Sequence, residues 1–253
     1  MRKHLSLLMM YTGRKIHWLI SVIILMIATE ELFFSGLRLG EGQPNFALAI
    51  TSSYIMPCFI LIGLVLMSVA ASMEHRKKLS NETELLRRRL EISERAAYLW
   101  EIIGNTLRCL MVIASQSIMI FLFYLIYLRN ADSTFTELQD FITFKGVSIL
   151  KFFFPGTEIT SWLSIILVAF SFGIAATALN IKRMKVSKVL LFIWILYLIT
   201  KVITNIGFSF DIDMMLVNIV LLGTDAIFLL YILVIAHDGK GNAEIKQARG
   251  EMI

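Results

Sequence analysis

The chain alternates long apolar runs with shorter polar segments. Six runs hold roughly 18 to 26 residues with few or no charges, and about 20 such residues in a helix cross a hydrocarbon core about 30 Å thick. The pattern predicts transmembrane helices at about residues 18–35, 46–71, 103–128, 161–179, 188–206 and 214–236. We therefore expect an all-α, polytopic membrane protein, with one transmembrane domain over residues 1–253.

The distribution of basic residues predicts the orientation of these spans. The N-terminal segment, the second and fourth connections and the C-terminal tail hold 18 of the 24 lysines and arginines, and the opposite connections hold five. Because basic connections stay on the cytoplasmic side, both termini are expected in the cytoplasm. The expected location is a cell membrane of the bacterial cytoplasmic type.

Composition excludes two broad classes. Hydrophobic residues make up 57% of the chain and charged residues 17%, whereas a soluble domain has about 25% charged residues. The net charge of +5 follows from the topology, and no basic segment interleaved with aromatic residues indicates nucleic-acid binding.

Two amphipathic segments lie beside the expected spans. Residues 1–17 mix leucine and methionine with basic residues, which predicts a helix lying in the inner interface of the membrane. In residues 74–100, Asn81 and Glu84 resemble a helix-capping pair, and leucines then interleave with arginines and glutamates. This pattern predicts an amphipathic helix that leads directly into the third span. Its basic face is suited both to anionic lipid and to a cytoplasmic partner, and the two interpretations are compatible.

Polar residues inside spans are candidates for function, because burying them in hydrocarbon is costly. Asp225 lies near the middle of the sixth span and Arg108 near the start of the third. They could form a structural ion pair with each other or contact a substrate. Gln116, between Ser115 and Ser117, could add hydrogen bonds between helices.

The segment Glu30-Glu31-Leu32-Phe33-Phe34-Ser35-Gly36 resembles the first motif, Glu-Glu-x-x-x-Arg, of the intramembrane CAAX-processing and bacteriocin-immunity proteases. In that family the glutamates activate water and histidines in later membrane helices complete the site. Here Ser35 stands at the arginine position, and the four histidines lie in flanking or cytoplasmic segments. We therefore favour a carboxylate pair at the outer interface over a hydrolase using Glu30 and Glu31.

Other catalytic signatures are missing from the sequence. The chain has no phosphate-binding Gly-x-x-x-x-Gly-Lys-Ser/Thr loop, no Gly-x-Ser-x-Gly elbow, no His-Glu-x-x-His helix and no Cys-x-x-Cys pair. Cys58 and Cys109 both fall in apolar runs and are expected as small buried residues. We expect no enzyme activity, no metal site and no cofactor in this chain, so that energy must come from a gradient or a partner.

The layout of spans and connections resembles the membrane subunit of type-2, G-like ATP-binding-cassette exporters. There an interfacial elbow helix precedes the first span, and a coupling helix between spans two and three sits in a groove of the ATPase. Glu74 and the Leu85-Leu86 pair match the loose pattern of that connection, and Ile92-Ser93-Glu94-Arg95 matches its Pro-x-Ser-Arg element without the proline.

This resemblance implies a permease that moves an amphiphilic peptide, lipid or drug, as a homo- or heterodimer with separate ATPases that hold ATP and magnesium. Residues expected at the coupling surface are Glu74, Leu85, Leu86, Arg87, Arg88, Arg89 and Arg95. Residues expected along the substrate path are Arg108, Gln116 and Asp225. The main alternative is a gradient-driven transporter or channel that uses Asp225 as its ion or proton site.

Overall fold

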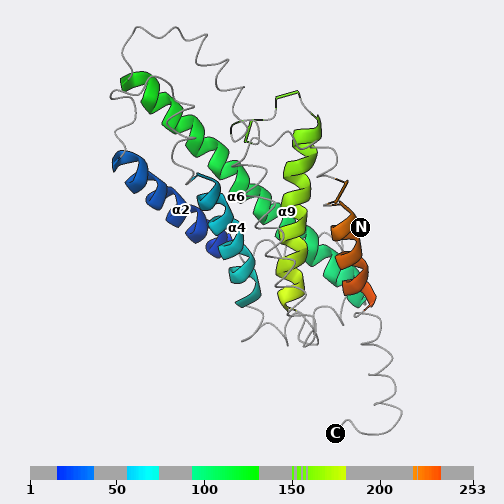
Figure 1. Cartoon of the computed structure of the whole chain (residues 1–253). Coiled ribbons are helices and arrows are strands. Elements are labelled where there is room, and N and C mark those ends of the chain that lie inside the picture. The colour runs from blue at the N-terminus through cyan, green and yellow to red at the C-terminus, as the bar shows by residue number, and fades with distance from the viewer. Residues whose placement is uncertain are drawn as a thin grey trace, which may run out of the picture.

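The computed structural model (Figure 1) describes residues 16–36, 56–73, 93–130, 150, 153–154, 156–157, 159–180, 219–220 and 222–234. Every regular element within these residues is an α-helix. The expected interfacial helix before residue 16, the span at 188–206 and the C-terminal tail lie outside them.

Five helices make up the described part of the chain. They are α2 (Ile16–Gly36), α4 (Met56–Met73), α6 (Glu94–Asn130), α9 (Ile159–Asn180) and an unlabelled helix at Leu222–Val234. Helices α2, α6 and α9 cover the expected first, third and fourth spans, α4 overlaps the second and extends two residues beyond it, and Leu222–Val234 lies within the sixth. By length and composition, residues 95–129 and 159–179 form helices able to cross a membrane.

Helix α6 is much longer than a bilayer requires. It has 37 residues, which at 1.5 Å per residue gives a length of about 55 Å. The hydrocarbon core is about 30 Å thick. The helix therefore extends well beyond the expected third span, and its first turns, from Glu94, belong to the segment expected to couple to a partner.

Ser93 starts this helix. The Ala96 N–H donates to Ser93 Oγ at 3.3 Å, and the Ala97 N–H donates to the Ser93 carbonyl at 3.0 Å. This is an N-cap, in which a serine hydroxyl satisfies an amide that has no partner within the helix. Residues 94–100 of the segment predicted to lead into the third span are thus continuous with that span, and residues 74–92 lie outside the described part of the chain.

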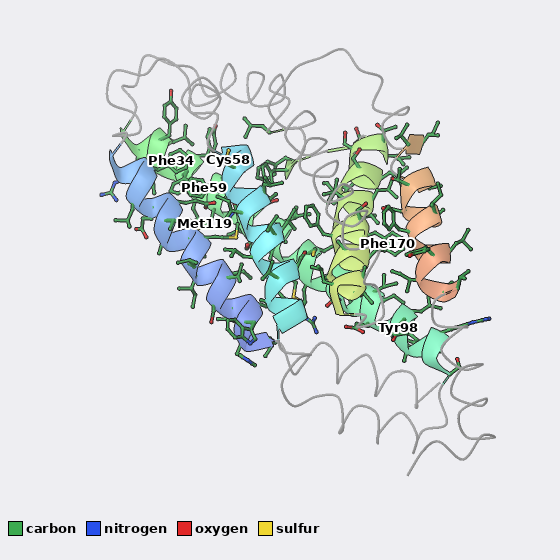
Figure 2. The ribbon with its side chains drawn as sticks, turned by 60° about the horizontal axis from the view of Figure 1, so that its bottom comes forward. Phe34, Cys58, Phe59, Tyr98, Met119 and Phe170 are labelled. Carbon is green, nitrogen blue, oxygen red and sulfur yellow. The ribbon has the colours of Figure 1, made fainter. Side chains whose placement is uncertain are left out.

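Helix α6 crosses the other labelled helices. It contacts α2, α4 and α9, and α4 also contacts α2 and α9. Figures 1 and 2 show α2 and α4 toward one end of α6, with α9 and the Leu222–Val234 helix toward the other. Figure 2 also places Phe34 and Tyr98 at opposite ends of the bundle.

Glycine permits the closest of these crossings. A Cβ atom at Gly173 of α9 would lie 2.9 Å from the backbone nitrogen of Thr106 and 3.1 Å from the carbonyl oxygen of Ile102. Because those atoms belong to the backbone of α6, they cannot rotate away. Gly173 thus brings the backbones of α6 and α9 together.

The contacts also give the relative directions of the helices. Met26 of α2 and Val112 of α6 both lie against Gly63 of α4, and farther along the same two helices the rings of Phe34 and Phe123 are 4.6 Å apart. Helices α2 and α6 are therefore parallel, as expected for the first and third spans of a polytopic protein.

The core is continuous and includes part of the connection before α9. Residues 171–178 of α9 are all buried, so this half of the helix is surrounded on every side. Leu150 and Phe153, which precede α9, are buried as well, and Ser117 Oγ lies 3.4 Å from the carbonyl oxygen of Phe153. These two residues of the connection therefore pack inward, against the bundle.

Candidate functional site

Polar side chains lie inside the bundle, whereas large apolar side chains cover its surface. The buried polar and charged residues are Glu30, Ser68, Glu101, Asn105, Arg108, Gln116, Ser161, Ser164, Ser171, Thr177 and Asp225. Each described helix exposes large apolar residues, among them Ile24, Ile62, Ile118, Trp162 and Leu230. Soluble proteins rarely expose apolar surface on this scale, and costly intramembrane polar residues characteristically face a bundle interior.

Helix α6 contributes one row of these polar residues. Glu101, Asn105, Arg108 and Gln116 are all buried. At 100° per residue they fall within a sector of about 80° of the helix. The row faces the neighbouring helices, so any movement of α6 shifts all four side chains.

The row is hydrogen-bonded to α9 near the C-terminal end of that helix. Arg108 Nη1 donates to Asn105 Oδ1 at 2.6 Å, and Asn105 Nδ2 donates to Thr177 Oγ1 at 3.0 Å. Thr177 Oγ1 donates in turn to the carbonyl oxygen of Gly173 at 3.0 Å. A guanidinium, an amide and a hydroxyl therefore form a continuous buried chain from α6 to α9.

A second polar contact joins α9 to the Leu222–Val234 helix. Ser171 Oγ lies 2.7 Å and 2.8 Å from the two carboxylate oxygens of Asp225 and 2.9 Å from the carbonyl oxygen of Leu167. A hydroxyl has one proton to donate, so it cannot donate to all three oxygens together. Asp225 is only 2% exposed, so it is a buried carboxyl group, and among the described residues the Ser171 hydroxyl is its hydrogen-bond partner.

Arg108 and Asp225 have different hydrogen-bond partners. The sequence suggested that they could pair inside the bundle, but Arg108 donates to Asn105 on its own helix and Asp225 contacts Ser171 of α9. The two expected path residues therefore belong to separate polar contacts on α9, six residues apart at Ser171 and Thr177.

The third expected path residue lies eight residues beyond Arg108 in the same row of α6. Gln116 is fully buried, and its side chain lies beside the Glu30 carboxyl group of α2. The adjacent Glu31 is exposed. The two glutamates thus lie on different sides of α2, and Glu30 is not at a solvated outer interface as the pair was expected to be.

Most of the expected coupling residues lie outside the described part of the chain. These are Glu74, Leu85, Leu86, Arg87, Arg88 and Arg89. Arg95 is described and lies exposed in the first turn of α6. Of the segment expected to couple to a partner, the structure therefore describes only residues 93–100, in the first turns of α6.

The described residues contain no cluster of three or more His, Cys, Asp or Glu side chains able to hold a metal ion. Both cysteines are free: Cys109 is buried and Cys58 is exposed on the apolar surface. The expectation that both are buried is therefore wrong for Cys58, because its position on α4 faces away from the neighbouring helices.

Sequence reasoning did not single out four residues that contribute to these contacts: Asn105, Thr177, Ser171 and, as an interior residue, Glu30. A usable signal existed for Asn105, since it lies one helical turn before Arg108 within an apolar run. For Thr177 and Ser171 the sequence holds no comparable signal, because hydroxyl residues commonly bond to their own helix. No family model matches the chain, and no curated protein or solved structure matches it either.

Proposed function

We propose that the chain is the membrane subunit of an exporter that moves an amphiphilic substrate, such as a peptide, lipid or drug, with energy from a separate ATPase. One observation carries this proposal. A single helix, α6, begins in the expected coupling segment at Glu94 and also carries the buried polar row from Glu101 to Gln116.

This geometry suits the transmission of force. An α-helix is held by hydrogen bonds along its whole length, so a push on its first turn displaces the whole rod. Ser93 caps the first turn of α6, so the helix has a defined N-terminal end on which a partner can act. Movement of α6 would change the contacts of Asn105 with Thr177 across to α9 and so open and close the polar interior.

The surface and interior fit an amphiphilic substrate. Polar groups in the interior bind its polar part, and apolar side chains around them bind its hydrocarbon part. In the complete assembly we propose six spans, both termini in the cytoplasm, a second permease subunit and one ATPase docked on each coupling segment.

The test uses the full-length chain purified in mild detergent from its native membrane. Replacing Arg87, Arg88 and Arg89 with glutamate should abolish co-purification of a P-loop ATPase and the ATP hydrolysis that accompanies it. Arg129→Glu is the matched control, because Arg129 is an exposed basic residue in the last turn of α6, at the far end of the helix. The control should retain both the ATPase and its activity.

Two outcomes would reject this proposal. One is a wild-type preparation that contains no ATPase and hydrolyses no ATP. The other is a charge-reversed variant that keeps its ATPase at wild-type level, since a docking surface cannot survive reversal of its three adjacent charges.

A gradient-driven transporter is the second candidate, favoured by the Asp225–Ser171 contact. A carboxyl group that is 2% exposed and faces a hydroxyl at 2.7 Å can carry a proton or coordinate a cation inside a membrane. In proteoliposomes without ATP, this candidate predicts collapse of an imposed proton or sodium gradient by the wild type and loss of that flux in Asp225→Asn. The exporter predicts no flux in either protein.

The structure offers no comparable support for an intramembrane hydrolase. Two catalytic glutamates must approach one water molecule, but Glu30 is buried between helices and Glu31 is exposed on a different face of α2. The carboxyl groups therefore face different surroundings.

A further inference from the structure

Glu30 and Gln116 are buried together between α2 and α6. Both side chains have no exposed surface. Neither oxygen of Glu30 and neither polar atom of Gln116 has a hydrogen-bond partner among the described residues, although the two groups lie side by side. Each of the two side chains can therefore still form hydrogen bonds, and each has the other beside it.

Apolar layers enclose this pair along the bundle. One turn before it, Met26 and Val112 pack against Gly63 of α4. One to two turns after it, the rings of Phe34 and Phe123 are in contact at 4.6 Å. Figure 2 shows Phe34 and Met119 at this end of the bundle, near Phe59 of α4. Apolar contacts therefore lie immediately before and after the pair along α2 and α6.

No cation of the described residues faces Glu30. The described side chains of α4 include one titratable group, Cys58, which is exposed. On α6, Arg108 lies eight residues before Gln116, about 12 Å along the helix axis, and donates to Asn105. Beyond Gln116, the titratable groups of α6 are Tyr124, Tyr127 and Arg129, and Arg129 is in the last turn.

We propose that Glu30 and Gln116 form a proton-binding site inside the membrane. An ionised carboxylate without a donor is very costly in such surroundings, whereas the neutral acid is not. In the described arrangement Glu30 therefore holds a proton: its carboxylate has taken one proton from water and become a carboxyl group. A small rotation of the Gln116 amide lets the carboxyl O–H donate to Oε1 while Nε2–H donates to the carboxyl C=O.

The ligand set favours a proton over a metal ion. Calcium takes six to eight oxygen ligands and magnesium six, whereas here one carboxyl group and one amide oxygen meet. The described residues contain no cluster of acidic, histidine or cysteine side chains around them.

Proton exchange at this site is linked to the contact between α2 and α6. Glu30 lies six residues from the end of α2, about 9 Å along the axis, so the aromatic layer of Phe34 and Phe123 separates it from that end. For the proton to leave, water must reach Glu30 past this layer. Release of the proton therefore accompanies separation of α2 from α6. This inference holds for any membrane-embedded role of the bundle and does not rest on the exporter proposal.

The test is chemical modification of the full-length protein in lipid nanodiscs with dicyclohexylcarbodiimide, which reacts with protonated carboxyl groups in apolar surroundings. Glu30 and Glu31 are adjacent and fall on the same peptide, so two matched variants are used to tell which of them carries the adduct. Glu31→Gln retains only Glu30, and Glu30→Gln retains only Glu31. Peptide mass spectrometry should find the adduct in the wild type and in Glu31→Gln, and its loss in Glu30→Gln. Adduct formation in Glu30→Gln at the wild-type level would place the reactive group at Glu31 and overturn the proposal.

A second measurement detects the proton without a chemical reagent. The infrared spectrum of the wild type near neutral pH should contain the C=O stretching band of a protonated carboxyl group, and this band should lose intensity in Glu30→Gln. Spectra that are identical in this region would overturn the proposal. Protection of Glu30 from the reagent by sodium chloride, but not by choline chloride, would also overturn it, because the site would then hold a sodium ion.

Discussion

Individual residues determine how closely these helices approach. Gly173 lies where α9 crosses α6, and its missing side chain leaves room for the Thr106 backbone. Four residues later the two helices are still close, and Thr177 Oγ1 accepts a hydrogen bond from Asn105 of α6. A glycine contact and a polar contact, one turn apart, thus hold the two helices together.

Gly173→Ala should lower stability. The new Cβ would lie 2.9 Å from a backbone nitrogen, and such overpacking typically costs about 1–3 kcal/mol. The measurement is the thermal unfolding midpoint of the full-length protein in detergent. Gly223→Ala is the control, because nothing lies within 4 Å of its Cβ position, and its midpoint should be unchanged or slightly higher. Equal midpoints for the two variants would contradict the close crossing.

A double-mutant cycle should detect the bond between Asn105 and Thr177. Combining Asn105→Leu with Thr177→Val should give a coupling free energy of about 0.5–1.5 kcal/mol. Ser115→Ala replaces Thr177→Val in the control cycle, because the Ser115 hydroxyl bonds to Val112 of its own helix at 2.8 Å. Coupling with Asn105 should then be close to zero. A coupling near zero in both cycles would show that the interhelical bond contributes nothing.

The sequence identifies buried polar residues better than their partners. Arg108, Gln116 and Asp225 stand out because each is a polar residue in an apolar run, and all three are buried. Their partners depend on how the helices are rotated and how far apart they pack, which hydropathy does not record. The sequence therefore suggested Arg108 with Asp225, whereas the structure gives Asn105 and Ser171 as their respective partners.

At the scale of elements, the apolar runs predict helices more securely than helix ends. Helix α2 covers residues 16–36 where the sequence predicts 18–35, and α9 covers 159–180 where it predicts 161–179. The start of α6 differs more: Ser93 caps the helix, which begins at Glu94, nine residues before the predicted start of the third span at residue 103. Hydropathy marks the apolar part of a helix and not the polar turns that precede it.

Ser93→Ala should destabilise the first turn of α6. Loss of an N-cap hydroxyl costs about 1 kcal/mol, and the amide of Ala96 loses its acceptor at 3.3 Å. Hydrogen exchange of the backbone amides of residues 95–97 should accelerate, while exchange in the centre of α6 stays unchanged. Ser93→Asp, which retains a capping oxygen, should restore protection. Unchanged exchange in Ser93→Ala would show that the cap does not hold this end of the helix.

At the scale of the whole molecule, the distribution of polarity among the described residues favours a membrane environment. Glu101, Arg108 and Asp225 are buried, whereas Ile118, Trp162 and Leu230 are among the residues that cover the surface. In water this arrangement would leave the apolar side chains exposed and would keep the charged groups away from solvent, and both are unfavourable. In a bilayer it satisfies both, because lipid covers the apolar surface and polar groups find partners inside.

The orientation of α6 gives the last prediction. Its 37 residues are long enough to place Ser93 and Arg129 on opposite sides of a bilayer, and the positive-inside rule places Ser93 in the cytoplasm. In a background with Cys58 and Cys109 replaced by alanine, a cysteine at Arg129 or Thr157 should react with an impermeant maleimide in intact cells. A cysteine at Ser93 should react only after the membrane is permeabilised. Thr157 and Ser93 are both exposed, so differences in labelling report the side of the membrane and not burial. The reverse labelling pattern would place the coupling segment outside the cell, where no ATPase could reach it, and would reject the exporter while leaving the helix bundle itself intact.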